Sequence, residues 1–260
     1  RMRRLVCLII LVKLLGVLDV YSQKKESNFQ LMADSCYVYL EKQDSVSFIN
    51  TLSQLYEAYL KENDTYYQIS KKLERILLED QSIRLLYLDA RKNKVELVEC
   101  IRTYMNEIDK RNSLYAFSVL KEHGWLTTDE ISERANEALF LIVQHCNDEE
   151  LQIQCLDMLK EKLTEYPTEK WHYAFLTDRF AMNQGKEQVY GTQKIIRKGI
   201  PYIVPLKYPE KVDSLRTEMG LSPLWDELNE EYDSNWSLEK YFQDLPLIKR
   251  IYDEYCSKRH

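Results

Sequence analysis

The sequence predicts a mainly α-helical protein, an irregular helical bundle with a small β-hairpin after the last long helix. Three observations predict this fold class. Apolar residues recur every three or four positions through most of the chain. Gly and Pro number only six each, and most of them follow His123, so the first half has few helix breakers. Short β-prone runs follow the last long helical pattern, between residues 188 and 204.

The first 23 residues have the layout of a secretory signal peptide. A basic start, Arg1 to Arg4, precedes an apolar run from Leu5 to Leu18 that only Lys13 and Gly16 interrupt, and polar residues follow it. The run is shorter than the roughly 20 apolar residues of a membrane span. We therefore expect an exported, periplasmic protein with no membrane span after signal cleavage. A retained N-terminal membrane anchor is the alternative.

The chain is acidic, with a formal net charge of −6, and removal of residues 1–23 takes away four basic residues and one acidic residue, which leaves −9. Nucleic acids and anionic membrane surfaces bind basic surfaces, so we expect neither as a partner. The expected partner is a small polar molecule or an envelope protein. Five irregularly spaced cysteines remain after cleavage, which predicts no disulfide framework, and no Cys-x-x-Cys pair predicts a zinc site.

Residues 24–69 are predicted to form an auxiliary helical segment, and residues 70–232 the main domain. The apolar positions of the auxiliary segment that share a helical face are Phe48, Leu52, Leu55, Tyr56, Tyr59 and Leu60. Two long helices open the main domain; their apolar positions are Ile69, Leu73, Ile76 and Leu77 in the first, and Leu97, Val98, Ile101, Tyr104, Met105 and Ile108 in the second.

Three further helices are predicted before the hairpin. Thr127 followed by Glu130 is a capping-box pattern that we expect to open the first of them. The second is expected to end before Pro167 and the third near Gly185. Their apolar stripes are Ile131, Ala135, Ala138, Leu139 and Ile142; Leu151, Cys155, Met158, Leu159 and Leu163; and Trp171, Ala174, Phe175 and Met182.

The last third of the chain changes pattern. Two β-prone runs, Gln188 to Arg197 and Ile200 to Val204, predict a hairpin within residues 187–204, with its turn at Lys198-Gly199. Short helices are expected near residues 212–219 and 223–232. Another is expected at 238–255, in a C-terminal helical tail of residues 233–260.

Four polar residues interrupt the apolar faces of these predicted helices. Asp80 and Arg84 continue the stripe of the first long helix, His145 follows Ile142 by three positions, and Asp178 follows Phe175 by three. Unpaired charges are costly to bury, so these side chains need partners. Their recurrence on three helices indicates helix faces that converge on a shared polar pocket.

The roles expected in such a pocket differ among these residues. His145 is the candidate general base, with Asp178 as the carboxylate that orients it, and Arg84 would hold an anionic group. The structural alternative is that Asp80 and Arg84 form an i,i+4 ion pair and that the others are satisfied core groups. His145 could bind a metal together with His123, Asp148, Asp178 and Asp80, but the adjacent His-Asp pair of metal-dependent phosphohydrolases is missing, so no metal site is predicted.

The string Tyr190-Gly191-Thr192-Gln193, preceded by Gln188, is the most specific motif. Gly191 allows a turn or a close approach of the backbone, and the amides of Gln188 and Gln193 can donate and accept hydrogen bonds. These residues either hold a polar ligand, with Gln193 positioning it, or join the hairpin to the helices.

Taken in order, these motifs resemble a bacterial family known as domain of unknown function, family 6624. The matching elements are Asp80-Gln81-Ser82-Ile83-Arg84, Gly124-Trp125, Gln144-His145-Cys146-Asn147, Leu176-Thr177-Asp178-Arg179, Gln188 to Gln193, Asp213-Ser214-Leu215-Arg216 and Gly220 to Leu224. Asn147 stands where the family pattern has Asp, and Leu126 where Pro follows Gly-Trp. The resemblance adds Gln81 and Arg179 to the candidate ligand-binding residues, but it supplies no reaction, and the cofactor is unknown.

The sequence therefore supports two functional hypotheses of different classes. The first is a polar pocket of Asp80, Gln81, Arg84, His145, Asp178, Arg179, Gln188, Tyr190 and Gln193 that binds, and in its enzymatic version acts on, a small polar or anionic ligand. The second is a non-catalytic interaction module of the cell envelope, in which the same residues form a structural ion-pair network.

Overall fold

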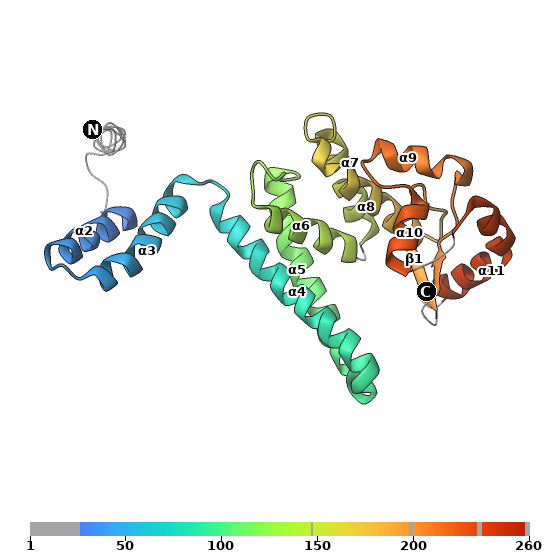
Figure 1. Ribbon diagram of the computed structural model, residues 1–260, viewed down its shortest axis with the longest axis horizontal. Coiled ribbons are helices and arrows are strands. Elements are labelled where there is room, and N and C mark those ends of the chain that lie inside the picture. The colour runs from blue at the N-terminus through green and yellow to red at the C-terminus, as the bar shows by residue number, and fades with distance from the viewer. Residues whose placement is uncertain (1–26, 147, 198–199, 233–235, 258–260) are drawn as a thin grey trace. The chain divides into compact units, whose positions relative to one another are not determined.

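The computed structural model describes residues 27–146, 148–197, 200–232 and 236–257 (Figure 1). The chain divides into two compact units, residues 1–68 and 69–260. The predicted fold class is confirmed: the described residues are mainly helical, and one small antiparallel hairpin follows the helix at residues 170–183. The predicted signal peptide and the predicted turn at Lys198-Gly199 lie outside the described residues.

The first unit is a hairpin of two helices, α2 (Asn28–Glu41) and α3 (Ser45–Asn63). The side chains of Ser27 and Asp44 cap the two N-termini by accepting from backbone N–H groups three residues further on. Only Cys36, Thr51 and Ala58 of the two described helices are fully buried. A pair of helices this short has little core of its own.

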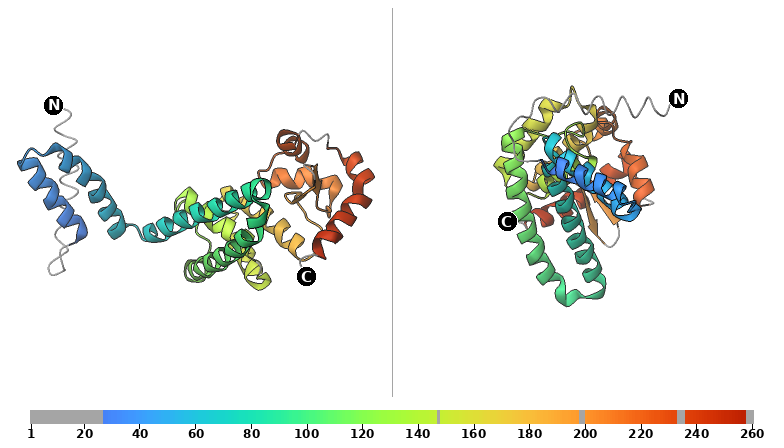
Figure 2. Two further views of the ribbon diagram at one scale, coloured as in Figure 1. Left: turned by 90° about the horizontal axis from the view of Figure 1, so that it is seen from below. Right: turned by 90° about the vertical axis from the view of Figure 1, so that its left-hand side faces the viewer.

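The second unit opens on the two longest helices of the described chain, α4 (Tyr67–Asn93) and α5 (Val98–His123), joined through the short 3₁₀ helix η2 (Val95–Leu97). Figure 2 shows them as neighbours connected at one end. Helix α5 ends at Gly124, whose φ of +72° suits a glycine after a helix.

Three helices follow: α6 (Glu133–His145), α7 (Glu149–Lys162) and, after the 3₁₀ helix η3 (Pro167–Glu169), α8 (Lys170–Asn183). The prediction that Thr127 opens α6 is wrong. Glu130 does accept from the Thr127 backbone N–H at 3.0 Å, but this pair closes a separate turn. The N-cap of α6 is Ser132, whose hydroxyl accepts from the Ala135 N–H at 3.2 Å.

The β-hairpin is shorter than predicted. It pairs β1 (Lys194–Arg197) with β2 (Ile200–Ile203), with Lys194 opposite Ile203. Residues 188–193 are not part of the strand, apart from an isolated bridge of Gln188 to Leu206. The backbone N–H groups of Val189, Tyr190 and Thr192 bond to the side chain of Asp178 instead.

The C-terminal helices enclose the hairpin. They are the 3₁₀ helix η4 (Pro209–Lys211), α9 (Val212–Glu218), α10 (Leu224–Tyr232) and α11 (Leu238–Cys256). Their buried core consists of Ile203, Leu206, Val212, Leu224, Leu228, Tyr241 and Ile248. Because Tyr241 and Ile248 belong to α11, the predicted C-terminal tail packs into this core.

Two further features concern the described residues alone. The cysteines among them are free thiols. None of the described helices is both long enough and apolar enough to cross a bilayer.

Candidate functional site

The sequence-predicted residues Asp80, Gln81, Arg84 and His145 come together in the second unit. Asp80 and Arg84 lie one turn apart on α4, so their side chains share a face. His145 is the last residue of α6. A fourth group, the carboxylate of Asp109, arrives from α5. We call Asp80, Arg84, Asp109 and His145 the α4 cluster.

Arg84 is the centre of the α4 cluster. Its Nε donates to Asp80 Oδ2 at 3.0 Å, and its Nη2 lies 2.8 Å from Asp80 Oδ1. The same Nη2 lies 2.7 Å from Asp109 Oδ1 and 2.8 Å from His145 Nδ1. Gln81 Nε2 donates to Asp80 Oδ2 at 2.8 Å. Asp80 therefore receives donors on both oxygens, and Arg84 connects three helices.

The contact with Arg84 fixes the tautomer of His145. A guanidinium nitrogen is a donor only, so Nδ1 must accept, and the ring proton of the neutral imidazole then sits on Nε2. Arg84 Nη2 carries two hydrogens, which are shared among three acceptor atoms: Asp80 Oδ1, Asp109 Oδ1 and His145 Nδ1. The His145 Nδ1 also lies 3.7 Å from Asp80 Oδ1. His145 thus presents an N–H on Nε2, and no described residue accepts it.

The two carboxylates of the α4 cluster have opposite electrostatic character. Burial disfavours the charge of Asp80, but the neighbouring His145 and the hydrogen-bonded Arg84 outweigh burial and lower its pKa to about 2. Burial raises the pKa of Asp109, and the neighbouring Asp80 charge adds to this although Arg84 and His145 oppose it. Asp80 is thus the firmly ionised partner of Arg84, whereas Asp109 is the group that takes up a proton more easily.

The α4 cluster is open to solvent on one side. The side chain of Asp80 is 4% exposed, whereas those of Arg84, Asp109 and His145 are 23%, 20% and 22% exposed. A small molecule can therefore reach three of the four groups. This partial opening distinguishes the α4 cluster from a closed ion-pair network.

The same residues are the candidate metal ligands among those described. One atom each of Asp80, Asp109 and His145 lies within 4.8 Å of the others. Two carboxylate oxygens and an imidazole nitrogen are a plausible ligand set for a divalent cation. The arginine nitrogen contacts all three atoms, however, so a cation at this position has to displace the Arg84 side chain.

Asp178 does not join the α4 cluster. It is completely buried on α8, and its carboxylate accepts from the backbone N–H groups of Val189, Tyr190 and Thr192 at 2.7 to 3.1 Å. The Thr192 hydroxyl donates to it at 3.0 Å. The predicted pairing of Asp178 with His145 is therefore wrong: the carboxylate within 4 Å of His145 is that of Asp80.

Gln188 and Gln193 close the segment that surrounds Asp178. Gln188 Nε2 donates to the carbonyls of Gln193 and Val204 at 3.0 and 2.7 Å, and its Oε1 accepts from the Gln193 N–H at 2.8 Å. Gln193 Nε2 donates to the Thr192 hydroxyl. Both glutamines are buried, and their amides bond to partners within residues 188–204 and not to a helix.

Gly191 lies at the tightest point of this segment. Its φ is +71°, and a Cβ atom there would lie 3.2 Å from Leu224 and 3.4 Å from Leu206 and Val212. Tyr190, the neighbouring predicted ligand residue, is also buried, and burial raises the pKa of its phenol to about 12. We call Asp178 with residues 188–193 the α8 cluster.

The α8 cluster continues into a pair of charged residues that sequence reasoning missed. Arg216 is completely buried on α9; its Nη1 donates to the Tyr190 carbonyl at 3.0 Å, and its Nη2 pairs with Glu227. Lys194 also pairs with Glu227, at 2.8 Å. The motif Asp213-Ser214-Leu215-Arg216 could have indicated this buried arginine. In the structure, Arg216 Nε donates to the Ser222 carbonyl, and Asp213 accepts from the Leu224 N–H.

Asp109 is the other residue missed, and a signal for it existed. It follows Met105 by four positions and Ile101 by eight, so it continues the apolar stripe of α5 in the same way that Asp80 continues that of α4. The remaining predicted residue, Arg179, follows Asp178 on α8 and is partly buried.

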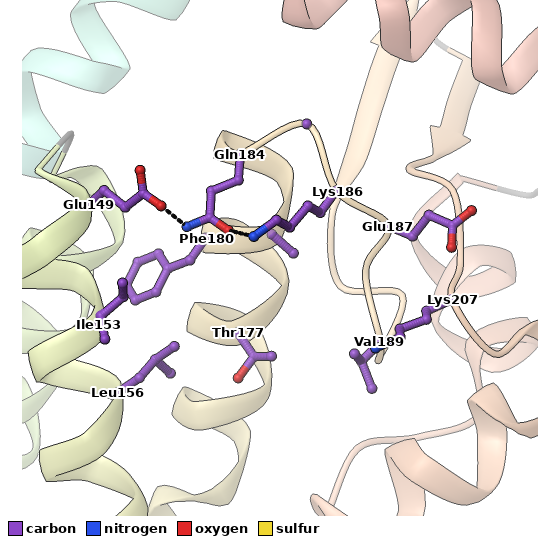
Figure 3. A pocket seen from close by; sticks show the side chains of 12 residues that line it. Glu149, Ile153, Leu156, Thr177, Phe180, Gln184, Lys186, Glu187, Val189 and Lys207 are labelled. Carbon is purple, nitrogen blue, oxygen red and sulfur yellow. Dashed lines mark hydrogen bonds between the residues drawn. The ribbon is translucent and has the colours of Figure 1, made fainter.

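A cavity of about 730 Å³ lies elsewhere in the second unit, between α7, α8 and residues 185–189 (Figure 3). Ile153, Leu156 and Phe180 form its apolar side. Gln184 bridges its rim, donating to Glu149 and accepting from Lys186 Nζ. Val189 is its one contact with the α8 cluster, through a residue whose N–H is bonded to Asp178.

Comparison with known proteins gives one match. A model of a family of unknown function (DUF6624) matches residues 68–237, which include every residue of the α4 and α8 clusters. No curated protein and no solved structure matches the chain. Since the family model covers well over half of the sequence, the chain belongs to the family of unknown function DUF6624.

Proposed function

We propose that this protein binds a small polar or anionic ligand at the α4 cluster. The observation that carries the proposal is a set of unused donors on the open side of the cluster. No described residue accepts from Arg84 Nη1 or from His145 Nε2, while the partners of Arg84 Nε and Nη2 hold the guanidinium in place. Preorganised donors lose little freedom on binding, which favours recognition.

The chemistry of these donors favours a ligand that carries acceptor oxygens. Arg84 Nη1 offers two N–H groups and His145 Nε2 a third, and carboxylate or phosphate oxygens match an arginine donor pair well. Asp109 can reduce its repulsion of a bound anion, because its raised pKa allows its carboxylate to take up a proton when the anion binds. Ligand affinity should then increase as the pH falls.

The geometry favours binding over general-base catalysis. A general base needs a free lone pair, and the contact with Arg84 occupies the Nδ1 lone pair of His145 and leaves the proton on Nε2. Asp178, the carboxylate expected to orient the imidazole, bonds to residues 189–192 instead. An enzymatic role for His145 accordingly requires Arg84 to move.

The competing function, an envelope interaction module with a structural polar network, has one supporting observation. In the α8 cluster the polar groups of Asp178, Gln188 and Gln193 bond to one another or to nearby backbone, and all three side chains are buried. Such an arrangement stabilises a fold without a ligand. We assign this role to the α8 cluster and ligand binding to the α4 cluster.

The proposal includes export, supported by the signal-like layout of residues 1–23. The mature protein then acts in the periplasm, with N-terminal membrane anchoring as the alternative. Cell fractionation followed by N-terminal sequencing tests this directly: cleavage before Lys24 supports export, whereas an intact N-terminus in the membrane fraction supports the anchor.

Thermal shift measurements test the ligand proposal. Inorganic phosphate, acetate and citrate serve as probes at pH 6, and Zn²⁺ is tested separately because the cluster contains metal-ligand chemistry. We expect at least one anion to raise the Tm of the wild type and to lose that effect in Arg84→Gln. Arg75→Gln is the matched control, because Arg75 is an exposed arginine on the same helix that pairs with Glu79.

Two outcomes contradict the proposal. One is the absence of any anion-induced shift in the wild type, and the other is an equal shift in Arg84→Gln. A shift with Zn²⁺ alone, lost in Asp109→Asn, would replace the anion site by a cation site built from the same residues.

A further inference from the structure

The hairpin of the first unit exposes an apolar stripe along α3. Its members are Val46, Ile49, Leu52, Tyr56 and Tyr59, which follow one another at intervals of three, three, four and three residues. They are between 42% and 68% exposed. This spacing places them on one face of the helix, as in the seam of a helical bundle.

Apart from Tyr59, whose ring packs edge-on against Phe29 of α2 at a centroid distance of 6.0 Å, the stripe lies away from the partner helix of the hairpin. Successive residues of a helix lie about 100° apart, so the stripe falls roughly opposite Thr51 and Ala58. These two are the residues of α3 that are buried within the unit. Helix α3 therefore buries Thr51 and Ala58 and partly buries Phe48 and Leu55 on its inner face. The large apolar side chains of the stripe remain exposed.

The residues around the stripe are almost uncharged. From Val46 to Tyr59 the one charged residue is Glu57, and its carboxylate pairs with Lys61 at 3.2 Å. The flanking positions are Ser47, Asn50, Ser53 and Gln54. Depletion of charge beside an apolar core is typical of homodimer interfaces.

We propose that the α3 stripe is a self-association surface, on which a second copy of this chain packs its own α3 stripe. Two such hairpins form a four-helix bundle, and a twofold axis brings the same patch together from both chains. The stripe spans fourteen residues, or about 20 Å of helix, enough for a continuous seam.

The charge pattern favours this partner over others. A helix that lies on an anionic membrane carries Lys and Arg along its polar face, whereas the described part of α3 contributes Lys61 alone. A different protein is usually selected by complementary charges beside the seam, and these positions are uncharged. Two identical uncharged seams meet without like-charge repulsion. The inference does not depend on the ligand proposal for the α4 cluster.

Light scattering on the purified protein measures the association. We expect a mass of twice the single chain at tens of micromolar, falling towards the single-chain mass on dilution. The double variant Ile49→Lys with Tyr56→Lys should raise the dimer dissociation constant at least about 100-fold, because four large apolar side chains per dimer lose their buried contacts. Circular dichroism checks that the variant keeps its helices.

The control changes exposed leucines outside the stripe. Leu85→Lys with Leu88→Lys alters two exposed residues of α4, which are 67% and 52% exposed, and should leave the dimer intact. A second variant, Ile49→Cys, should form a disulfide between two copies under mild oxidation, mapped by peptide mass spectrometry. A monomeric wild type, or a dimer that survives the α3 lysines, overturns the proposal.

Discussion

The α4 and α8 clusters begin from the same sequence signal and end in different structures. In both, an aspartate interrupts the apolar stripe of a helix. Asp80 pairs with Arg84, which keeps donors facing solvent, whereas Asp178 accepts four N–H or O–H groups and is completely buried. A buried charge thus indicates a need for partners, and the partners decide whether a site remains open.

The largest expected effect separates the two clusters by stability. Asp178→Asn removes a charge that accepts from Val189, Tyr190 and Thr192 and places an amide N–H₂ against those donors. We expect a loss of about 4 kcal/mol in unfolding free energy, measured by urea denaturation, without loss of anion binding in the protein that remains folded. Asp157→Asn, at an exposed position of α7, is the control and should cost under about 0.5 kcal/mol. An effect as small for Asp178 would show that its hydrogen bonds matter little.

Gly191→Ala tests the close packing of the α8 cluster. The added Cβ combines a left-handed backbone with contacts of 3.2 to 3.4 Å to three core side chains, and should cost about 3 kcal/mol in thermal unfolding. Gly220→Ala has almost the same φ, +72°, but nothing within 4 Å of its Cβ, and should cost about 1 kcal/mol. Equal losses would mean that only backbone strain acts at Gly191.

Asp80→Asn tests the ionised partner in the α4 cluster. Because the pKa of Asp80 is lowered from 3.8 to about 2, its stabilising contribution is fully present above its ordinary pKa and is lost as the pH falls towards 2. The variant should lose about 2 kcal/mol at pH 7 and show a flatter stability curve between pH 4 and 2. If urea denaturation shows the same loss of stability between pH 4 and 2 in the variant and the wild type, the lowered pKa does not belong to Asp80.

The smallest expected effect concerns the other carboxylate of the same cluster. Asp109→Asn should change stability at pH 7 by under about 1 kcal/mol, since burial already disfavours its charge and raises its pKa. Its effect should appear in ligand binding, where anion affinity becomes less dependent on pH. Isothermal titration in buffers of different ionisation enthalpy measures the proton uptake; uptake equal to that of the wild type would exclude Asp109 as the proton acceptor.

Helical periodicity predicted most of the fold because apolar spacing determines which face of each helix is buried. It identified the helices of the main domain and placed Asp80, Arg84, His145 and Asp178 on buried faces. The start of α6 was missed because Thr127 and Glu130 satisfy the capping pattern in an isolated turn, and Ser132 caps the helix.

The division of the polar residues into two clusters was beyond the sequence pattern. Periodicity gives the direction of a side chain relative to its own helix, but not which helix it meets. The sequence pattern predicted that Asp178 pairs with His145. In the structure its partners lie in the segment Gln188 to Gln193, which the sequence predicted to be part of a β-strand. β-Propensity reflects side-chain packing more than an intrinsic backbone preference, so the residue types of this segment could not show whether it forms a strand.

The carboxylate of Asp178 does for residues 189–192 what a neighbouring strand does for a sheet. Amide protons held by a single buried side chain cannot exchange one at a time through fraying of an edge, because releasing any of them exposes the charge. Hydrogen exchange at Val189, Tyr190 and Thr192 should therefore follow opening of the entire C-terminal core. A stretch without regular secondary structure then belongs to the slowest-exchanging part of the molecule.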